Sequence, residues 1–214
     1  MKAPTPYPDL SLETPLWQAG LTAGGVDEAG RGAWAGPVVT GVVVLPMQAE
    51  ILQVLRGVRD SKMMTPHQRE IWAVKIKQTA LDWAVGSADN REIDELGILR
   101  ATRLAMQRAI EMLGTAPDHL LLDAVILREV DLPQTSLFKG DAVSLSIAAA
   151  SVLAKTARDE LMVGCEDDYP GYGFARHKGY GTRLHHDCLA VLGPCAIHRA
   201  SFEPVRGVMT RETG

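Results

Sequence analysis

Cysteine is scarce in this sequence, and its spacing excludes the usual structural uses of the thiol group. The 214 residues contain three cysteines, an odd number, and no two of them form a Cys-x-x-Cys pair. The nearby histidines are His177, His185, His186 and His198. Their spacing to the cysteines matches no zinc-binding pattern. Free thiols in a reducing compartment are therefore predicted for Cys165, Cys188 and Cys195.

Long apolar segments are also missing. The longest, Val38 to Leu45, is interrupted by Thr40 and Gly41 and is far shorter than a membrane-spanning helix. No basic segment precedes an apolar one at the N-terminus, so no secretory signal is expected. With 46% hydrophobic and 22% charged residues, the composition is that of a globular protein. The sequence predicts a cytoplasmic protein without a membrane partner.

Positive charge is not in excess over the chain as a whole. The net charge of −4 argues against a protein that coats nucleic acid through bulk electrostatics. The C-terminal part differs, because from Arg176 onward six lysines and arginines face only three acidic residues. A basic end on an acidic chain is compatible with a phosphate-rich substrate.

The first half of the chain predicts a tail, three strands and a helix. Residues 1–20 contain four prolines and no periodic pattern, which predicts a poorly ordered tail. Strands are expected over Thr22 to Asp27, Val38 to Leu45 and Leu81 to Ser87. A helix is expected from Thr65 to about Thr79, because Thr65, Pro66 and Gln68 together form a capping box with proline at the first helical position.

Strands and helices alternate in the second half. Apolar residues recur at three- and four-residue steps from Ile93 to Leu113 and predict an amphipathic helix, which Gly97 is expected to kink. Short strands are expected over His119 to Ala124 and Ser136 to Phe138. Further helices are expected over Ser144 to Met162 and Leu184 to Leu192. This order predicts an α/β domain with a mixed sheet.

Four acidic residues stand where a site on such a sheet would need them. Asp27 and Glu28 lie at the end of the first strand, Asp123 ends a later strand, and Asp141 lies at a loop-to-helix junction. Functional groups gather beyond the carboxyl ends of strands in open α/β sheets. Clustered carboxylates favour hard cations such as Mg²⁺ or Mn²⁺, and two such ions can activate a water and stabilise a leaving oxygen in phosphoryl transfer.

Other interpretations of these residues stay open at this point. An acid after a strand is often a solvated turn residue, and Asp141 at a helix start also complements the helix dipole. The turn from Ala29 to Gly36 lacks the Gly-Lys-Ser/Thr of a phosphate-binding loop. Its Arg31, between Gly30 and Gly32, is suited to a phosphate or a sugar hydroxyl, or is an exposed arginine in a tight turn.

Several segments, taken in order, resemble the ribonuclease HII family, the type 2 ribonucleases H. They cover nearly all of the chain after residue 20. They are Gly25-Val26-Asp27-Glu28-Ala29-Gly30-Arg31-Gly32, Ala35-Gly36-Pro37-Val38, Asp60-Ser61-Lys62, Leu121-Leu122-Asp123, Lys139-Gly140-Asp141, Ser146-Ile147-Ala148-Ala149-Ala150-Ser151, Ala154-Lys155, Arg158-Asp159, His177-Lys178-Gly179-Tyr180-Gly181-Thr182 and His198-Arg199-Ala200-Ser201-Phe202.

The resemblance implies a ribonuclease H-like fold, in which helices flank a mixed five-stranded sheet and a helical C-terminal extension follows. It implies an endoribonuclease that binds Mg²⁺ or Mn²⁺ through Asp27, Glu28, Asp123 and Asp141. Such an enzyme cuts on the 5′ side of a ribonucleotide by two-metal-ion catalysis and leaves a 3′-hydroxyl and a 5′-phosphate. Its partners would be RNA–DNA hybrids and duplex DNA with embedded ribonucleotides.

The resemblance also implies roles in substrate binding. Gly30, Arg31 and Gly32 would read the 2′-hydroxyl, largely through backbone groups, and Tyr180 would stack on the sugar of the following deoxynucleotide. Tyr180 as a loop aromatic that covers core is the alternative. Three further residues would contact phosphates, namely Lys62, Lys178 and Arg183. Each of them is also compatible with a solvated surface position.

The expected domain organisation is a tail over residues 1–20, a catalytic domain over 21–170 and a substrate-binding extension over 171–214. A monomer is expected. Two rival functions are a DNA-junction nuclease of the same fold class and a non-catalytic module that binds hybrids. Neither accounts for the Gly-Arg-Gly and His-Lys-Gly-Tyr segments.

Overall fold

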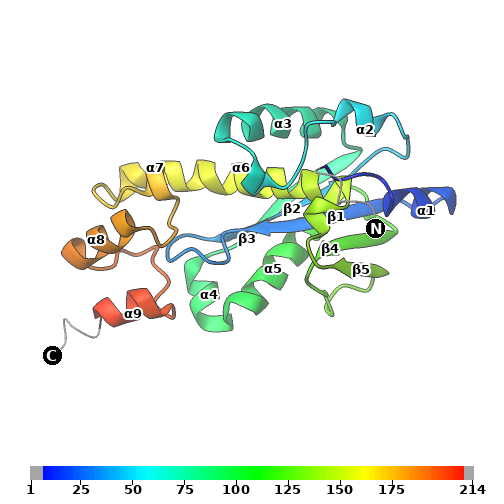
Figure 1. The fold of residues 1–214 in the computed structure, drawn as a ribbon. Helices are drawn as coiled ribbons and strands as arrows, with labels where there is room; N and C mark the ends of the chain where they lie inside the picture. Colours follow the sequence, from blue (N-terminus) through cyan, green and yellow to red (C-terminus); the bar gives the residue numbers. More distant parts are fainter. Residues whose placement is uncertain (1–6, 210–214) are drawn as a thin grey trace, which may run out of the picture.

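A mixed five-stranded sheet with helices on both faces forms the centre of the molecule (Figure 1). The structure is a computed structural model that describes residues 7–209. Along the sheet, the strands are β3 (Asp82–Ala88), β2 (Val38–Val44), β1 (Ala23–Ala29), β4 (His119–Asp123) and β5 (Gln134–Leu137). The predicted α/β class with a ribonuclease H-like mixed sheet is confirmed.

β1 joins the antiparallel part of the sheet to its parallel part. β1 pairs antiparallel with β2, and β2 pairs antiparallel with β3. On its other side β1 pairs parallel with β4, which pairs parallel with β5. The carboxyl ends of β1 and β4 therefore meet at the same edge of the sheet.

The long helix α6 (Leu145–Asp168) covers one face of the sheet at short range. Its first half consists largely of alanine and serine, which lets the helix backbone approach strand glycines. A Cβ on Gly25 would lie 2.1 Å from the carbonyl carbon of Ser146, and one on Gly41 would lie 2.5 Å from the carbonyl oxygen of Ala150. Outside α6 lies α3 (Pro66–Thr79), which starts with the predicted Thr65–Gln68 capping box.

The opposite face of the sheet is covered by α5 (Ile98–Glu111), which packs on β2 and β3. Its apolar side chains, Met106 among them, contact Val26 and Leu122 of the central strands. The single helix expected over residues 93–113 is divided in two. Gly97, with φ at 78°, ends α4 (Asn90–Leu96), since a positive φ cannot continue a right-handed helix.

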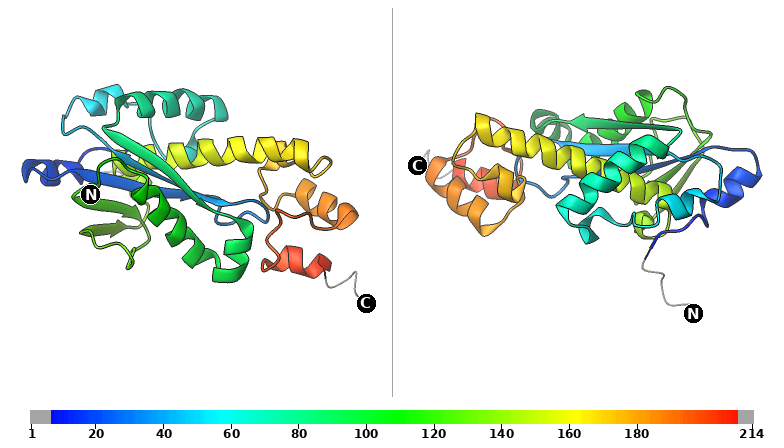
Figure 2. Two further views of the ribbon diagram at one scale, coloured as in Figure 1. Left: turned by 180° about the vertical axis from the view of Figure 1, so that it is seen from behind. Right: turned by 90° about the horizontal axis from the view of Figure 1, so that it is seen from above.

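Short helical segments complete the chain. They are α1 (Glu13–Gln18), α2 (Ile51–Val54), η1 (Ser61–Met63), η2 (Gly140–Ala142), α7 (Phe174–His177), α8 (Arg183–Leu192) and α9 (Glu203–Met209). Figure 2 shows α7, α8 and α9 gathered at one end of the sheet, beside the end of α6. The domain division at residue 170 stays a prediction. Along residues 7–209, no helix combines the length and the apolarity that crossing a bilayer requires.

The expectation of a poorly ordered tail over residues 1–20 is wrong for residues 7–20, and residues 1–6 lie outside the described part. Asp9 forms a bridge with Ser144, and α1 follows. Glu13 is fully buried, and its Oε1 accepts hydrogen bonds from the Ser144 hydroxyl and from both the amide and the hydroxyl of Ser146. These long-range contacts at the start of α6 hold a segment whose own sequence predicts no order.

Glu13→Ala is expected to lower the free energy of unfolding by about 3 kcal/mol, because three donors at the start of α6 lose a charged acceptor in a buried place. Urea unfolding of both proteins measures the difference. Glu50→Ala, which removes an exposed carboxylate, serves as the control and should change stability by less than about 0.5 kcal/mol. Equal stability of Glu13→Ala and the parent chain would show that α1 is not anchored through this residue.

Candidate active site

Asp27 and Asp123 lie next to each other because of the register between β1 and β4. Val26 pairs with Leu122, so the next residue of each strand is one of the two acids. Side chains alternate along a strand, so Asp27 shares the α6 face with Gly25. Burial raises the pKa of Asp27 well above its ordinary value, and the charge of Glu28 raises it further, against hydrogen bonds from Ser151 and the Glu28 amide.

Glu28 stands beside this pair. Burial raises its pKa, against the hydrogen bond and charge of Arg31, whose Nη1 lies 3.0 Å from Glu28 Oε1. The charge of Asp123 raises the pKa of Glu28 as well, which places these two acids within electrostatic reach of each other. The second carboxylate oxygen, Oε2, is buried without a hydrogen-bond partner in the described part of the chain. An oxygen of this kind can accept a hydrogen bond or coordinate a cation.

Asp141 reaches the group from the other side. It is buried in η2, whose first residue, Gly140, donates a 2.8 Å hydrogen bond from its amide to Asp123 Oδ1. Burial raises the pKa of Asp141 to about 6, with further contributions from the charges of Asp60 and Asp123. All four predicted acids are thus brought to one edge of the sheet.

Lys62 lies among these acids. Burial lowers its pKa, but the charges of Asp60, Asp27, Asp141 and Asp123 outweigh that effect and raise it. Within residues 7–209, no three His, Cys, Asp or Glu side chains converge as closely as the ligands of a bound ion do. The positive charge of Lys62 therefore offsets part of the repulsion among these acids.

The oxygen-only character of this group fits a hard divalent cation. Buried carboxylates with raised pKa values, one of them with an orphaned oxygen, gain more from a dication than from water or protons. Carboxylate oxygens are the ligands that Mg²⁺ and Mn²⁺ prefer, whereas zinc favours thiols and imidazoles. The residues that would hold the ion are Asp27, Glu28, Asp123 and Asp141.

Asp141→Asn is expected to stabilise the chain above neutral pH, measured by urea unfolding with a chelator present. Because the folded-state pKa of about 6 exceeds the ordinary 3.8, the folded chain favours the protonated acid. The contribution of Asp141 to stability is therefore present at low pH and lost as pH rises through 6. Asparagine cannot ionise, so the gain should be near zero at about pH 4 and reach about 2 kcal/mol at about pH 8. A gain that does not vary with pH would contradict this explanation.

The glycine-rich loop after β1 presents free backbone amides. Gly30 has φ at 96°, and a Cβ there would lie 2.0 Å from Arg158 Nε, so only glycine fits. Gly32 faces open space, with no atom within 4 Å of a Cβ position. The amides of Arg31 and Gly32 donate to no acceptor in the part of the chain that the structure describes. They are therefore available to a ligand.

The predicted C-terminal substrate contacts, Tyr180, Lys178 and Arg183, lie in different surroundings. Tyr180 is half-buried; Ala33 forms a bridge with it, and Lys155 Nζ and Arg158 Cζ each lie 5.0 Å from its ring centroid. Lys178 adopts a left-handed φ of 54°, and its Nζ donates to the Ala175 carbonyl. Arg183 is not brought to the acids. Its side chain is 95% exposed at the start of α8, near Asp187.

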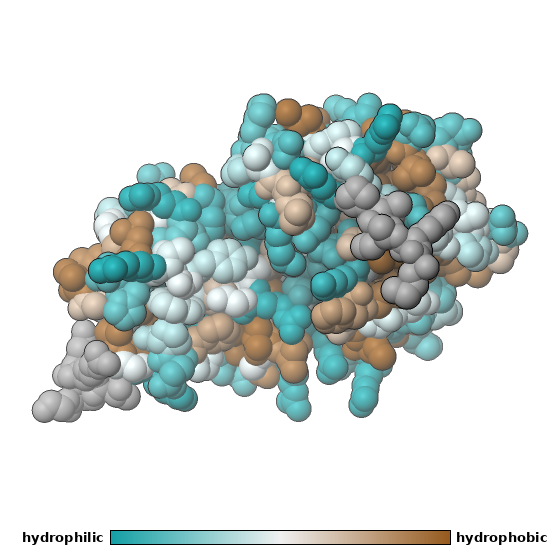
Figure 3. Space-filling model, in the orientation of Figure 1, coloured by the Kyte–Doolittle hydropathy of each residue, from teal (hydrophilic) through white to brown (hydrophobic). Residues whose placement is uncertain are grey.

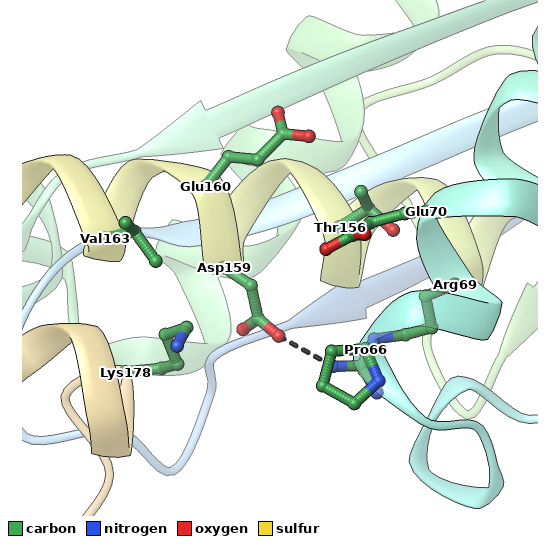
Figure 4. Close-up of a pocket in the computed structure, with 8 residues that line it drawn as sticks. All are labelled: Pro66, Arg69, Glu70, Thr156, Asp159, Glu160, Val163 and Lys178. Atoms are coloured by element: carbon green, nitrogen blue, oxygen red, sulfur yellow. Dashed lines mark hydrogen bonds and ion pairs between the residues drawn. The ribbon is translucent and has the colours of Figure 1, made fainter.

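Lys178 also lines a pocket between α6, α3 and the end of α7, drawn in Figure 4. Asp159 bonds to both Arg69 and Lys155 there, so its charge is already matched. Figure 3 shows hydrophilic residues gathered near the middle of one face of the molecule. The pocket contains none of the four acids.

Sequence patterns alone missed several residues that shape this site. Asp60 and Ser151 touch the acids, yet they were noted only as members of similar segments. Arg199 was assigned to a basic C-terminal arm, and this is wrong, because its side chain is fully buried. Arg158 is buried as completely. No local pattern marks a buried arginine, because its acceptors are backbone carbonyls far away in sequence.

Cys165, Cys188 and Cys195 are unpaired, as predicted for free thiols. Three of the nearby histidines, His177, His185 and His198, are buried and packed on one another. Burial lowers the pKa of His185 and of His198 to about 4, so both are neutral at pH 7.

A mixed sheet in this strand order, with acids at the meeting ends of β1 and β4, defines a nuclease of the ribonuclease H-like class. A model of the family described as Ribonuclease HII matches residues 24–205. The chain belongs to the ribonuclease HII family. It is a hydrolase that acts on RNA–DNA hybrids.

Individual relatives agree with this assignment. The chain is 50% identical over 208 residues to a ribonuclease HII of Synechococcus sp. (strain JA-3-3Ab), covering 97% of this chain and 93% of the relative. The crystal structure of ribonuclease H2 from Pyrococcus horikoshii OT3 superposes with a TM-score of 0.75 at 27% identity, covering 89% and 98% of the two chains. The fold is also that of Bst-RNase HIII in complex with Mn²⁺ (TM-score 0.71, 18% identity, covering 89% and 70%).

Proposed function

We propose that this chain hydrolyses the phosphodiester on the 5′ side of a ribonucleotide, leaving a 3′-hydroxyl and a 5′-phosphate. The substrates are RNA–DNA hybrids and duplex DNA with embedded ribonucleotides. The observation that carries the proposal is the pairing of β1 with β4, which sets the buried Asp27 beside the half-buried Asp123. A group of this kind serves phosphoryl transfer better than any structural purpose, since it destabilises the free chain.

Asp27, Glu28, Asp123 and Asp141 would hold Mg²⁺ or Mn²⁺, in a two-ion arrangement. When bound, the ions supply charge neutralisation, activation of a water and stabilisation of the leaving oxygen. The protein's own part is positioning. The Gly140 amide fixes the carboxylate of Asp123, and the Glu28 amide fixes that of Asp27. Lys62 balances the charge of the acids and would contact a phosphate.

Recognition of the ribonucleotide falls to the Gly-Arg-Gly loop and Tyr180. The unpaired amides of Arg31 and Gly32 can donate hydrogen bonds to a 2′-hydroxyl oxygen. Deoxyribose has no such oxygen. The Tyr180 ring, with Lys155 Nζ and Arg158 Cζ each 5.0 Å from its centroid, would pack against the following sugar. Lys178 and Arg183 would contact phosphates farther along the duplex.

A hollow lined by Arg31, Arg103 and Arg128 extends the site past the loop. Its volume is about 370 Å³, and neither Arg103 nor Arg128 forms an ion pair with another described residue. Unpaired arginines beside the acids are suited to the phosphates of the duplex.

Replacing Arg103 and Arg128 together by glutamine is expected to weaken duplex binding and to reduce the slope of log affinity against log salt by about 2. The loss should be equal for a hybrid and for all-DNA, because phosphates carry no sugar information. Fluorescence anisotropy over a salt series measures the slope. Lys75→Gln, an exposed charge on α3, is the control and should leave it unchanged. An unaltered slope in the double variant would remove the hollow from the duplex path.

Cleavage of a matched pair of duplexes tests the proposed function. One duplex is all DNA and the other differs by a single ribonucleotide, and Mg²⁺ or Mn²⁺ is added or withheld by chelation. The expected result is one cut, 5′ to the ribonucleotide, only when the ion is present.

Each other outcome selects a rival. Equal cutting of both duplexes, or of a four-way DNA junction only, would support a DNA-junction nuclease. Binding of the hybrid that survives chelation, with no product under any ion, would support a non-catalytic module. Products with a 5′-hydroxyl would exclude the proposed direction of attack.

A further inference from the structure

Two arginines are fully buried without a carboxylate partner. Arg158 and Arg199 have no exposed side-chain surface, and none of their hydrogen bonds in residues 7–209 goes to an acid. Burial lowers the pKa of Arg199 to about 9, and the neighbouring charge of Arg158 contributes to the shift. Asp159 and Asp94 act on Arg158 and Arg199 only through their charges, and a buried cation without a hydrogen-bonded carboxylate is costly.

Arg199 holds the Gly-Arg-Gly loop from inside. Its Nη2 donates to the Gly30 carbonyl at 2.8 Å, its Nη1 to the Arg31 carbonyl at 2.9 Å, and its Nε to the Gly36 carbonyl at 3.0 Å. The carbonyls of Gly30 and Arg31 belong to the same peptide groups as the amides of Arg31 and Gly32. Because a peptide group is planar, fixing its carbonyl fixes the direction of its N–H. Arg199 therefore orients the two amides that have no partner of their own.

Arg158 does the same for the other side of the site. Its three nitrogens donate to the carbonyls of Pro37, Lys178 and Ala35 at 2.9, 2.9 and 3.1 Å. Its guanidinium group also lies over the Tyr180 ring, with 5.0 Å between Cζ and the ring centroid. One side chain thus ties the loop after β1 to the segment that carries Tyr180.

Hydrogen bonds through two neutral histidines, His198 and His185, hold the backbone carbonyl of Tyr180. The Cys195 amide donates to His198 Nδ1 at 2.9 Å, so the proton of neutral His198 is on Nε2. That proton is donated to His185 Nε2 at 3.0 Å, which leaves the proton of His185 on Nδ1. His185 Nδ1 then donates to the Tyr180 carbonyl at 3.0 Å. With these tautomers the longer contact between His198 Nδ1 and the Cys195 carbonyl, at 3.3 Å, carries no hydrogen bond, because neither atom holds a proton.

We propose that Arg199 and Arg158 are positioning residues for sugar recognition: Arg199 aims the amides of Arg31 and Gly32 at the 2′-hydroxyl, and Arg158 holds Tyr180 at a fixed distance from them. The proposal rests on the proposed function, because it assumes that these two elements read the sugar. It gives a functional reason for two buried charges, because apolar side chains of similar volume would pack equally well at a lower desolvation cost.

Arg199→Lys tests the proposal with little change in charge or volume. A lysine ammonium cannot reach three carbonyls in the planar fork geometry of arginine. The measured quantity is the ratio of the Kd for an all-DNA duplex to the Kd for the same duplex with one ribonucleotide, with divalent ions chelated so that no strand is cut. We expect Arg199→Lys to lower this ratio about tenfold, the equivalent of one hydrogen bond to the 2′-hydroxyl, while the Kd for all-DNA stays the same.

Phe202→Leu is the matched control. Phe202 packs on the same guanidinium group, at 5.1 Å, but holds no loop carbonyl, so the ratio should be retained. An unchanged ratio in folded Arg199→Lys would overturn the inference and leave the proposed function intact. A ratio of one in the parent chain would instead overturn the proposed function. An equal loss of affinity for both duplexes in Arg199→Lys would mean a merely structural role and would also overturn the inference.

Should Arg199→Lys fail to fold, NMR of the parent chain decides the question. The ribonucleotide duplex is expected to shift the amide resonances of Arg31 and Gly32 together with the guanidinium resonances of Arg199, whereas the all-DNA duplex shifts none of them. Amide shifts without any change at Arg199 would overturn the inference.

Discussion

Asp27→Asn is expected to reduce cleavage of a single-ribonucleotide duplex by about three orders of magnitude or more while the chain stays folded. Asp27 is buried next to Glu28 and Asp123, whose charges raise its pKa, and its own charge acts on Lys62. Asparagine keeps the shape and can still accept the Glu28 amide, but it cannot neutralise a dication. Initial rates under saturating Mg²⁺ and under Mn²⁺ measure the loss, with circular dichroism as the check on folding.

The same variant should unfold at a higher temperature than the parent chain when divalent ions are chelated. A buried carboxylate with a raised pKa costs stability at neutral pH, and the amide removes that cost. Asp167→Asn, an equal change of charge on the exposed end of α6, should alter neither activity nor stability. A variant Asp27→Asn that is folded and cuts at near-normal rates would remove the carboxylate group from the mechanism.

Local patterns were sufficient to predict much of the fold. The Thr65–Gln68 capping box starts α3 as predicted, since all of its hydrogen bonds are made within four residues. The alternation of strands and helices gave the α/β class, and the glycine at position 97 does interrupt a helical pattern. Asp27 and Asp123 were both predicted at strand ends, and they meet because β1 and β4 are neighbours in the sheet.

The remainder depends on partners distant in sequence. Glu13 bonds to residues more than 130 positions away, and its segment has no pattern of its own. Arg199 reaches carbonyls more than 160 positions away, so an arginine that resembles a solvent-facing phosphate contact is fully buried. Residue type and spacing hold no information about such contacts, because any backbone carbonyl is an equally good acceptor.

Gly25→Ala is expected to have the largest effect on stability, a loss of about 4 kcal/mol or more, enough to prevent folding of many domains. The added Cβ would lie 2.1 Å from the carbonyl carbon, 2.5 Å from the carbonyl oxygen of Ser146 and 2.4 Å from the nitrogen of Ile147. All three are backbone atoms near the start of α6, so no side chain can rotate away. The helix would have to move off β1, and Ser151, which bonds Asp27, would move with it. Urea unfolding and the yield of folded protein measure the effect.

Gly164→Ala, in the second half of α6, is the matched control. No atom lies within 4 Å of its Cβ position, so the methyl group meets open space. Alanine is the better helix former, and the control should therefore gain about 1 kcal/mol. If the same glycine-to-alanine change lowers stability at position 25 and raises it at position 164, the close approach of β1 and α6, and not glycine flexibility, sets the stability of the site. If Gly25→Ala unfolds at the same urea concentration as the parent chain, α6 can shift without cost, and the acids on β1 are held less rigidly than these contacts require.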